Sequence, residues 1–208
     1  MIRTVLASLL LTTTAASAEN VVLVLDASGS MWGQIEGKTK IEIARAAVAD
    51  LVGHWKADDA LGLVAYGHRS KGDCKDIETL IPYGPLDSKA YLATVNKLNP
   101  KGMTPLSAAV IQAADSLKIS EQKATVILVS DGEETCEMDP CQVGKELEAR
   151  GVDFTAHVIG FDVPNPAHQA QLRCLAENTG GRYFNVRDAA ELRAALGTLA
   201  SVSTEPAL

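Results

Sequence analysis

The chain has 208 residues, of which 47% are hydrophobic and 22% are charged, and its formal net charge at pH 7 is −7. This length suits one domain with a sizeable core, and the acidic balance argues against nucleic acid or an anionic lipid surface as a partner. A membrane span is not predicted either, because no apolar run reaches the roughly 18 residues that a spanning helix needs.

The first residues, Met1 to Ala18, have the pattern of a secretory signal peptide. Arg3 gives a positive start, Val5–Leu11 is mostly apolar, and the end at Ala16–Ala18 suits a signal peptidase. We therefore predict cleavage after Ala18, which leaves 208 − 18 = 190 residues and changes the net charge from −7 to −8, since one Arg and no acid is lost. A structured strand or helix in this segment is the alternative.

Five segments have the composition of buried strands, and the first and third are almost continuous in Val, Ile and Leu. The five are Val21–Leu25, Ala60–Tyr66, Thr125–Ser130, Asp153–Gly160 and Arg182–Val186. A sixth strand is predicted over Asp76–Ile81, which is shorter and more polar and therefore suits an edge of the sheet.

Helical patterns lie between these strands. Apolar residues recur at i, i+3 and i+4 in Thr39–Trp55 and in Leu106–Leu117. Further helices are predicted over Cys141–Arg150, Ala167–Asn178 and Ala189–Leu199. Because strands and helices alternate, the sequence predicts an α/β fold with a mostly parallel sheet and helices on both faces.

Oxygen-bearing side chains stand at three boundaries of these elements. Asp26, Ser28 and Ser30 follow the first strand in the stretch DASGSMWG. Thr104 precedes a helix in KGMTPL, and Asp131 leaves the third strand in LVSDGEE. The carboxyl ends of parallel strands share one rim, where ligands bind, so we expect these five side chains to converge.

Two carboxylates and three hydroxyls form a set of hard oxygen ligands. Such ligands suit Mg²⁺, and Mn²⁺ or Ca²⁺ as alternatives. Neutral hydroxyls leave the cation electrophilic, so a carboxylate from another molecule can complete its coordination. The sequence therefore predicts a divalent cation and a protein partner that presents an acidic side chain.

The three motifs together resemble those of the von Willebrand factor A (VWA) domain family. In that family Asp-x-Ser-x-Ser, a distant Thr and a distant Asp form the metal-ion-dependent adhesion site, and Asp26, Ser28, Ser30, Thr104 and Asp131 match it position by position. The likeness covers about Val21 to Leu199. The resemblance implies a doubly wound, Rossmann-like sheet of six strands with one antiparallel edge strand. It also implies cation-dependent protein binding and no catalysis.

The sequence is most similar to short, exported bacterial members of that family. The resemblance therefore implies a periplasmic or secreted protein after removal of the signal peptide. We expect residues 1–18 to be the signal peptide, 19–200 the VWA domain and 201–208 a short tail.

Four further residues are candidates for the rim that contacts a partner. Met31 and Trp32 follow the metal loop and either contact the partner or, for Trp32, brace the loop. His68 and Arg69 lie on a basic loop that could receive an acidic partner, although a solvated hairpin is the commoner reason for such a loop. His157 alternates with apolar residues in a strand and is predicted to be buried and hydrogen-bonded.

Two other classes of function remain open from the residues alone. An open magnesium site can polarise a phosphate, so a metal-dependent hydrolase of phosphoesters is one alternative. Against it, the sequence has no Gly-x-Ser-x-Gly elbow and no phosphate-binding glycine loop. The other alternative is a metal-independent structural scaffold.

The four cysteines, Cys74, Cys136, Cys141 and Cys174, suggest two disulfides in an exported chain, with three pairings open. A zinc site is the rival, but the spacing in CEMDPC is wider than usual for zinc. The topology implied by the resemblance favours Cys74–Cys136 together with Cys141–Cys174. The rival pair Cys136–Cys141 would close a short local loop and leave the other two cysteines free.

Overall fold

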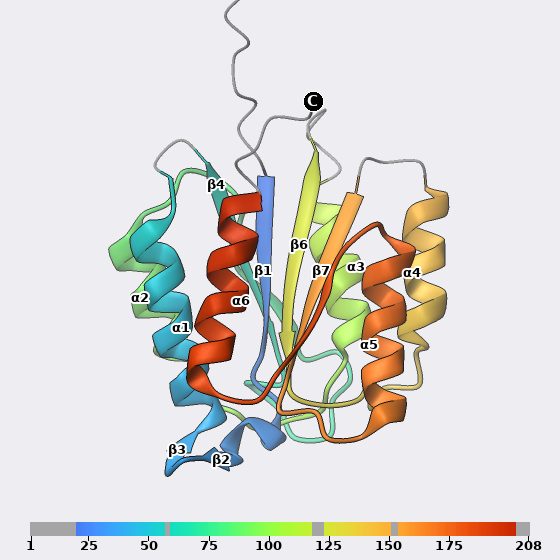
Figure 1. Ribbon diagram of the computed structural model, residues 1–208, viewed down its shortest axis with the longest axis horizontal. Helices are drawn as coiled ribbons and strands as arrows, with labels where there is room; N and C mark the ends of the chain where they lie inside the picture. Colours follow the sequence, from blue (N-terminus) through green and yellow to red (C-terminus); the bar gives the residue numbers. More distant parts are fainter. Residues whose placement is uncertain (1–19, 57–58, 118–122, 151–153, 203–208) are drawn as a thin grey trace, which may run out of the picture.

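A six-stranded sheet forms the centre of the computed structural model, which describes residues 20–56, 59–117, 123–150 and 154–202 (Figure 1). Its strands, in spatial order, are β5 (Ile77–Ile81), β4 (Ala60–Tyr66), β1 (Asn20–Asp26), β6 (Ala124–Ser130), β7 (Phe154–Phe161) and β8 (Tyr183–Val186). Every neighbouring pair is parallel except β4 with the edge strand β5. The predicted sheet, including its antiparallel edge strand, is confirmed.

Helices cover both faces of this sheet, as Figure 1 shows. One face packs against α1 (Lys40–His54), α2 (Ser88–Val95) and α6 (Ala189–Val202), and the other against α3 (Leu106–Leu117), α4 (Pro140–Ala149) and α5 (Pro166–Asn178). Side chains alternate along a strand, so Val21, Leu23 and Leu25 face the first group while Val22 and Val24 face the second. This two-sided burial explains why β1 is almost entirely apolar.

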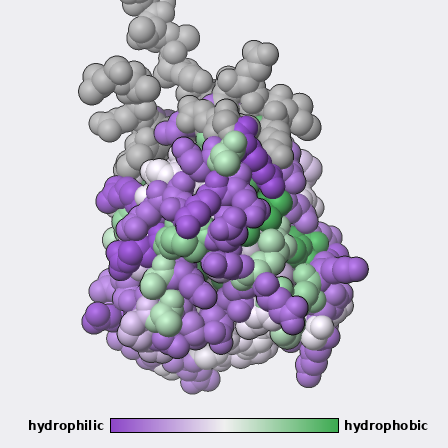
Figure 2. All heavy atoms as spheres, turned by 90° about the vertical axis from the view of Figure 1, so that its right-hand side faces the viewer, coloured by the Kyte–Doolittle hydropathy of each residue, from purple (hydrophilic) through white to green (hydrophobic). Residues whose placement is uncertain are grey.

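The outer surface over α4 and α5 is mainly hydrophilic, with hydrophobic residues in small groups between the polar ones (Figure 2). This fits helices that bury one face and expose the other. Among the described residues, no helix combines the length and the apolar character that crossing a membrane requires.

Three short elements were not predicted. A 3₁₀ turn, η1 (Gly29–Trp32), is followed by a hairpin of β2 (Gln34–Ile35) and β3 (Lys38–Thr39). The helix α2 was missed as well, because only two of its residues, Tyr91 and Val95, are buried. Its eight residues therefore carry little helical periodicity. The predicted signal peptide, and Asp153 at the start of one predicted strand, lie outside the described residues.

Two disulfides link parts of the chain that are distant in sequence. Cys74 and Cys136 are bonded with their Cα atoms 5.6 Å apart, and Cys141 and Cys174 with theirs 4.9 Å apart. The second bond joins the neighbouring helices α4 and α5. The favoured pairing is confirmed, and the zinc site and the Cys136–Cys141 pair are ruled out.

His157 is a buried, hydrogen-bonded residue of β7, as predicted. The residue is only 8% exposed, and its Nδ1 accepts a hydrogen bond from the Arg182 backbone N–H at 3.0 Å. Burial, with the positive charges of Lys123 and Arg182, lowers the pKa of His157 to about 4. The folded protein therefore keeps this imidazole neutral well below its usual titration range.

This lowered pKa predicts a loss of stability in acid. Between about pH 6.5 and 4 the unfolded chain protonates His157 while the folded chain does not, so protons favour unfolding. His157 contributes up to one proton of this slope, or about 1.4 kcal/mol per pH unit. We expect His157→Gln to lose less unfolding free energy than the wild type between pH 7 and pH 4.5 in urea titrations. The other titratable groups contribute equally to both proteins. Equal losses of unfolding free energy in the variant and the wild type would therefore contradict the lowered pKa of His157.

Candidate metal centre

Three loops meet at the rim formed by the carboxyl ends of β1 and β6, the end of the molecule that also carries β2 and β3 in Figure 1. Ser28 pairs with Gly102 as an isolated parallel bridge, and the Gly29 N–H donates to the Gly102 carbonyl at 3.0 Å. The Lys101 N–H also donates to the Ala27 carbonyl at 3.2 Å. The loop that leads to Thr104 is thus fastened against the loop that carries the two serines.

A chain of side-chain oxygens crosses the rim. The Ser28 and Ser30 hydroxyl oxygens lie 2.9 Å apart, and the Ser30 hydroxyl donates to Asp131 Oδ1 at 2.6 Å. Ser30 and Asp131 are separated by 101 positions in the sequence. The fold therefore brings together three of the five residues that the sequence predicted to converge.

Asp26 lies directly behind this chain and is fully buried. Its Oδ1 accepts from the Ser28 N–H at 2.7 Å, and its Oδ2 accepts from the Tyr66 hydroxyl at 2.8 Å and the Ser130 hydroxyl at 2.9 Å. Burial, and then the charge of Asp131, raises the pKa of Asp26 to about 6. All of these donors are neutral, so a cation at the rim would relieve the repulsion between the two carboxylates.

Thr104 is held at the rim by the loop that follows Asp131. Its N–H donates to the Thr135 hydroxyl oxygen at 2.7 Å, and the Thr135 N–H donates back to its carbonyl at 3.2 Å. Glu134 adds a second attachment, because its carboxylate accepts from the N–H groups of Ser107 and Cys136, both at 2.8 Å. We call residues 134–136 the clasp, since they fasten the start of α3 to the loop of Asp131.

Sequence reasoning missed a lysine at this rim. Lys40 is the first residue of α1, and its Nζ lies 3.1 Å from Asp131 Oδ2 and 3.0 Å from Asp162 Oδ2. Burial lowers the pKa of Lys40, but the two carboxylates outweigh it and the pKa is raised overall, so the ammonium is charged. A signal was present, because Lys40 stands in helical register with the buried Ala44 and Val48.

The apolar rim candidates behave differently from one another. Met31 is fully buried in the core and is not available to a partner, so its prediction as a rim residue was wrong. Trp32 is 50% exposed, and its Nε1–H donates to the Pro100 carbonyl at 2.9 Å. Trp32 therefore braces the loop while leaving half of its surface open.

The basic rim candidates already have acidic partners within their own loop and strand. His68 Nε2 lies 3.0 Å from Glu78 Oε2, and Arg69 Nε donates to Asp76 Oδ1 at 2.7 Å. Arg69 stays 46% exposed at its side chain. These pairings reduce the positive field that the loop offers, and its contact with a partner stays a prediction.

The oxygen set suits a hard divalent cation. It offers hydroxyls and carboxylates at one rim, and Asp26 is a buried charge without a cationic partner among its hydrogen-bond donors. Within the part of the chain that the structure describes, no three His, Cys, Asp or Glu residues gather to hold a metal by themselves. Cation binding here would therefore depend on the hydroxyls of Ser28, Ser30 and Thr104.

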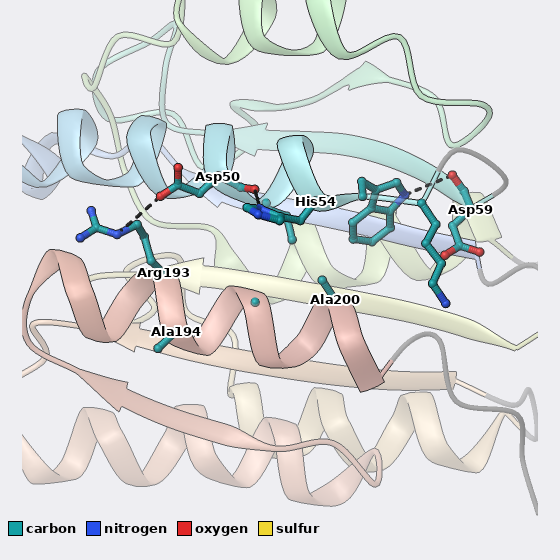
Figure 3. Close-up of a pocket in the computed structure, with 10 residues that line it drawn as sticks. Asp50, His54, Asp59, Arg193, Ala194 and Ala200 are labelled. Atoms are coloured by element: carbon teal, nitrogen blue, oxygen red, sulfur yellow. Dashed lines mark hydrogen bonds and ion pairs between the residues drawn. The ribbon is translucent and has the colours of Figure 1, made fainter.

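A hollow of about 760 Å³ lies elsewhere, between α1 and α6 (Figure 3). Its lining residues Trp55 and Asp59 precede β4, so it lies at the amino-terminal edge of the sheet, opposite Asp26. Its polar groups pair with one another. Arg193 Nε lies 3.5 Å from Asp50 Oδ2, and the Trp55 Nε1–H donates to the Asp59 carbonyl. The converging oxygens, not this hollow, are the candidate site.

Sequence comparisons match the chain to one family over most of its length. The profile of the von Willebrand factor type A domain matches residues 20–198. The chain is 30% identical over 181 residues to protein YwmC of Bacillus subtilis, covering 83% of this chain and 78% of that protein. It is also 29% identical over 157 residues to inter-alpha-trypsin inhibitor heavy chain H2 of Sus scrofa, covering 70% of this chain and 16% of that one.

Solved structures are similar to the fold. The von Willebrand factor domain of the type V pili tip protein Mfa5 from Porphyromonas gingivalis has a TM-score of 0.72 at 15% identity, covering 94% of this chain and 99% of that one. A von Willebrand factor type A protein from Catenulispora acidiphila has a TM-score of 0.73 at 23% identity, covering 90% of this chain and 43% of that one. At such identities the likeness concerns the fold alone.

Proposed function

Because this chain belongs to the von Willebrand factor type A domain family, whose domains generally mediate protein interactions, we propose that it binds a protein partner through a divalent cation at the rim. The observation that carries this proposal is the chain of oxygens from Ser28 through Ser30 to Asp131, backed by the buried Asp26. We further propose that the protein acts outside the cytoplasm, in the bacterial envelope or beyond it. The predicted signal peptide and the two disulfides support that location.

The residues of the site would contribute to cation binding in different ways. The hydroxyls of Ser28, Ser30 and Thr104 are neutral ligands, while Asp26 and Asp131 supply the negative charge. Asp26 is fixed by the hydrogen bonds that both of its oxygens accept, so it is positioned before any ion arrives. When bound, Mg²⁺ would act as a Lewis acid that attracts a carboxylate oxygen of the partner.

Isothermal titration of Mg²⁺ tests the cation site directly. We expect Asp26→Ala and Thr104→Ala to weaken Mg²⁺ binding by about tenfold or more, because each removes one oxygen ligand or its charge. Thr94→Ala is the matched control, since the Thr94 hydroxyl donates to the Ala90 carbonyl of its own helix, α2. Unchanged affinity in both rim variants would refute the site.

Partner capture tests the rest of the proposal. The mature chain is used as bait for envelope proteins with Mg²⁺ and with a chelator, and the captured partner is then stripped of acidic side chains at its contact surface. Binding that needs both Mg²⁺ and one of these acids supports the proposal. Binding that survives the chelator would indicate a metal-independent scaffold. Turnover of model phosphoesters that is lost with the chelator would indicate a hydrolase.

A further inference from the structure

The fold places the ammonium group of Lys40 beside the candidate metal centre. Its side chain is only 11% exposed, and it lies between Asp131 and Asp162 at 3.1 and 3.0 Å. Lys38, two residues earlier on the hairpin, is exposed to solvent. Burying a lysine costs free energy of desolvation, which the pairing of Lys40 with these two carboxylates offsets, so its charge is held at the rim instead of in solvent.

The two oxygens of Asp131 are divided between different partners. Oδ1 accepts from the Ser30 hydroxyl at 2.6 Å and so faces the hydroxyl ligands, whereas Oδ2 faces the Lys40 ammonium. Lys40 is thus paired with the same carboxylate group that is a candidate ligand of the cation. Asp162 shares the ammonium and is itself 43% exposed at its side chain, so it moderates this effect.

We propose that Lys40 determines the specificity of the rim. Its charge lowers the affinity for a divalent cation and raises the affinity for an acidic group of the partner. This inference rests on the proposed function. The ammonium offsets part of the charge of Asp131, so a bound divalent cation is held less tightly and stays less neutralised by the protein. The same positive charge attracts an incoming carboxylate, so the two affinities are tuned in opposite directions.

A purely structural role for Lys40 predicts a different pattern of signs. If the ion pairs only anchor the start of α1 against the rim, their loss would disorder the site and weaken the binding of both cation and carboxylate. If Lys40 acts as proposed, loss of its charge strengthens the binding of the cation and weakens the binding of the carboxylate. The two readings can therefore be separated by measuring both affinities on the same variant.

Lys40→Met keeps the length of the side chain and removes its charge. Titration calorimetry should show roughly tenfold tighter Mg²⁺ binding than in the wild type, because one unit charge close to the cation has been removed. Lys38→Met is the matched control with the same change in net charge, and its Mg²⁺ affinity should stay within about twofold, because exposed charges are screened. Thermal unfolding in chelator and in Mg²⁺ gives a second readout, and the stabilisation by Mg²⁺ should be larger in Lys40→Met.

Acetate is the probe for the acidic group. With Mn²⁺ bound, displacement of its coordinated water by acetate is followed by water-proton relaxation at constant ionic strength. We expect Lys40→Met to bind acetate several times more weakly than the wild type and Lys38→Met to match the wild type. Asp162→Asn removes the competing acid, so it should shift both affinities the other way, with weaker Mg²⁺ binding and tighter acetate binding.

Three outcomes overturn the inference. They are weaker Mg²⁺ binding in Lys40→Met, unchanged acetate binding in that variant, and equal behaviour of Lys40→Met and Lys38→Met. In each case a wild type that still binds Mg²⁺ leaves the proposed function standing. A wild type that binds no Mg²⁺ refutes the proposed function, and this inference with it.

Discussion

Gly67→Ala should destabilise the fold by about 3 kcal/mol or more and remove cation binding at the rim. Gly67 adopts a φ of +70°, and a Cβ added there would lie 2.6 Å from the Met103 carbonyl oxygen and 2.8 Å from the Ser28 Cα. Neither neighbour can move freely, because both are backbone atoms. The same glycine accepts hydrogen bonds from Lys101 and Gly102 at 3.0 and 2.7 Å. Its replacement would therefore push apart the two loops that carry the hydroxyls.

Gly72→Ala is the matched control for this prediction. Gly72 has nearly the same φ, +69°, but nothing lies within 4 Å of an added Cβ. Gly72→Ala should therefore incur only the cost of a left-handed backbone at alanine, about 1–2 kcal/mol, without a collision. Urea unfolding and Mg²⁺ titration of the two variants separate these costs. Similar unfolding free energies and similar Mg²⁺ affinities would show that close approach at Gly67 is unimportant.

The sheet was predictable because both of its faces are covered. Residues Val21–Leu25 are apolar at every position, which is unusual unless a strand is buried on two sides. The strands and the longer helices were accordingly placed to within a few residues of their bounds. The convergence of Ser28, Ser30 and Asp131 also followed from the sequence, because parallel strands bring their carboxyl ends to one rim. That these residues hold a metal stays a prediction.

The remaining features depend on contacts that no local pattern encodes. Met31 follows the metal loop, and only the 3₁₀ turn η1 directs its side chain into the core. Lys40 stands in helical register with buried residues, but its partner Asp162 lies 122 positions later on another loop, so their ion pair is not visible in the sequence. Gly67 was not singled out, because its role arises from the approach of Met103 and Ser28 and not from its neighbours in the sequence. Such features require the packed loops themselves.

The disulfide Cys74–Cys136 connects two loops at the site. Cys136 is the last residue of the clasp, and its neighbour Thr135 exchanges two hydrogen bonds with Thr104. Cys74 lies between β4 and β5, in the loop whose residue Asp76 accepts three hydrogen bonds from Arg69 and Ser70. The bond therefore limits the motion of the clasp relative to a loop that has its own internal network. Through the clasp, it also limits the motion of Thr104.

Replacing both Cys74 and Cys136 with serine is expected to lower the unfolding free energy by about 2–4 kcal/mol. Groups joined in one hydrogen-bond network are typically coupled by about 1 kcal/mol, so Mg²⁺ affinity should fall by about fivefold in the same variant. Urea unfolding and Mg²⁺ titration of this double variant measure the two effects. The double variant of Cys141 and Cys174 is the control, since that bond joins α4 to α5.

The control should lose stability and keep its Mg²⁺ affinity, because neither α4 nor α5 carries a candidate ligand of the rim. This difference separates coupling through the clasp from a general loosening of the fold. A general loosening would weaken Mg²⁺ binding in both variants in proportion to their loss of unfolding free energy. Coupling through Thr135 weakens it only when Cys136 is released. Equal Mg²⁺ affinities in the two double variants would therefore show that the clasp holds Thr104 without help from the disulfide.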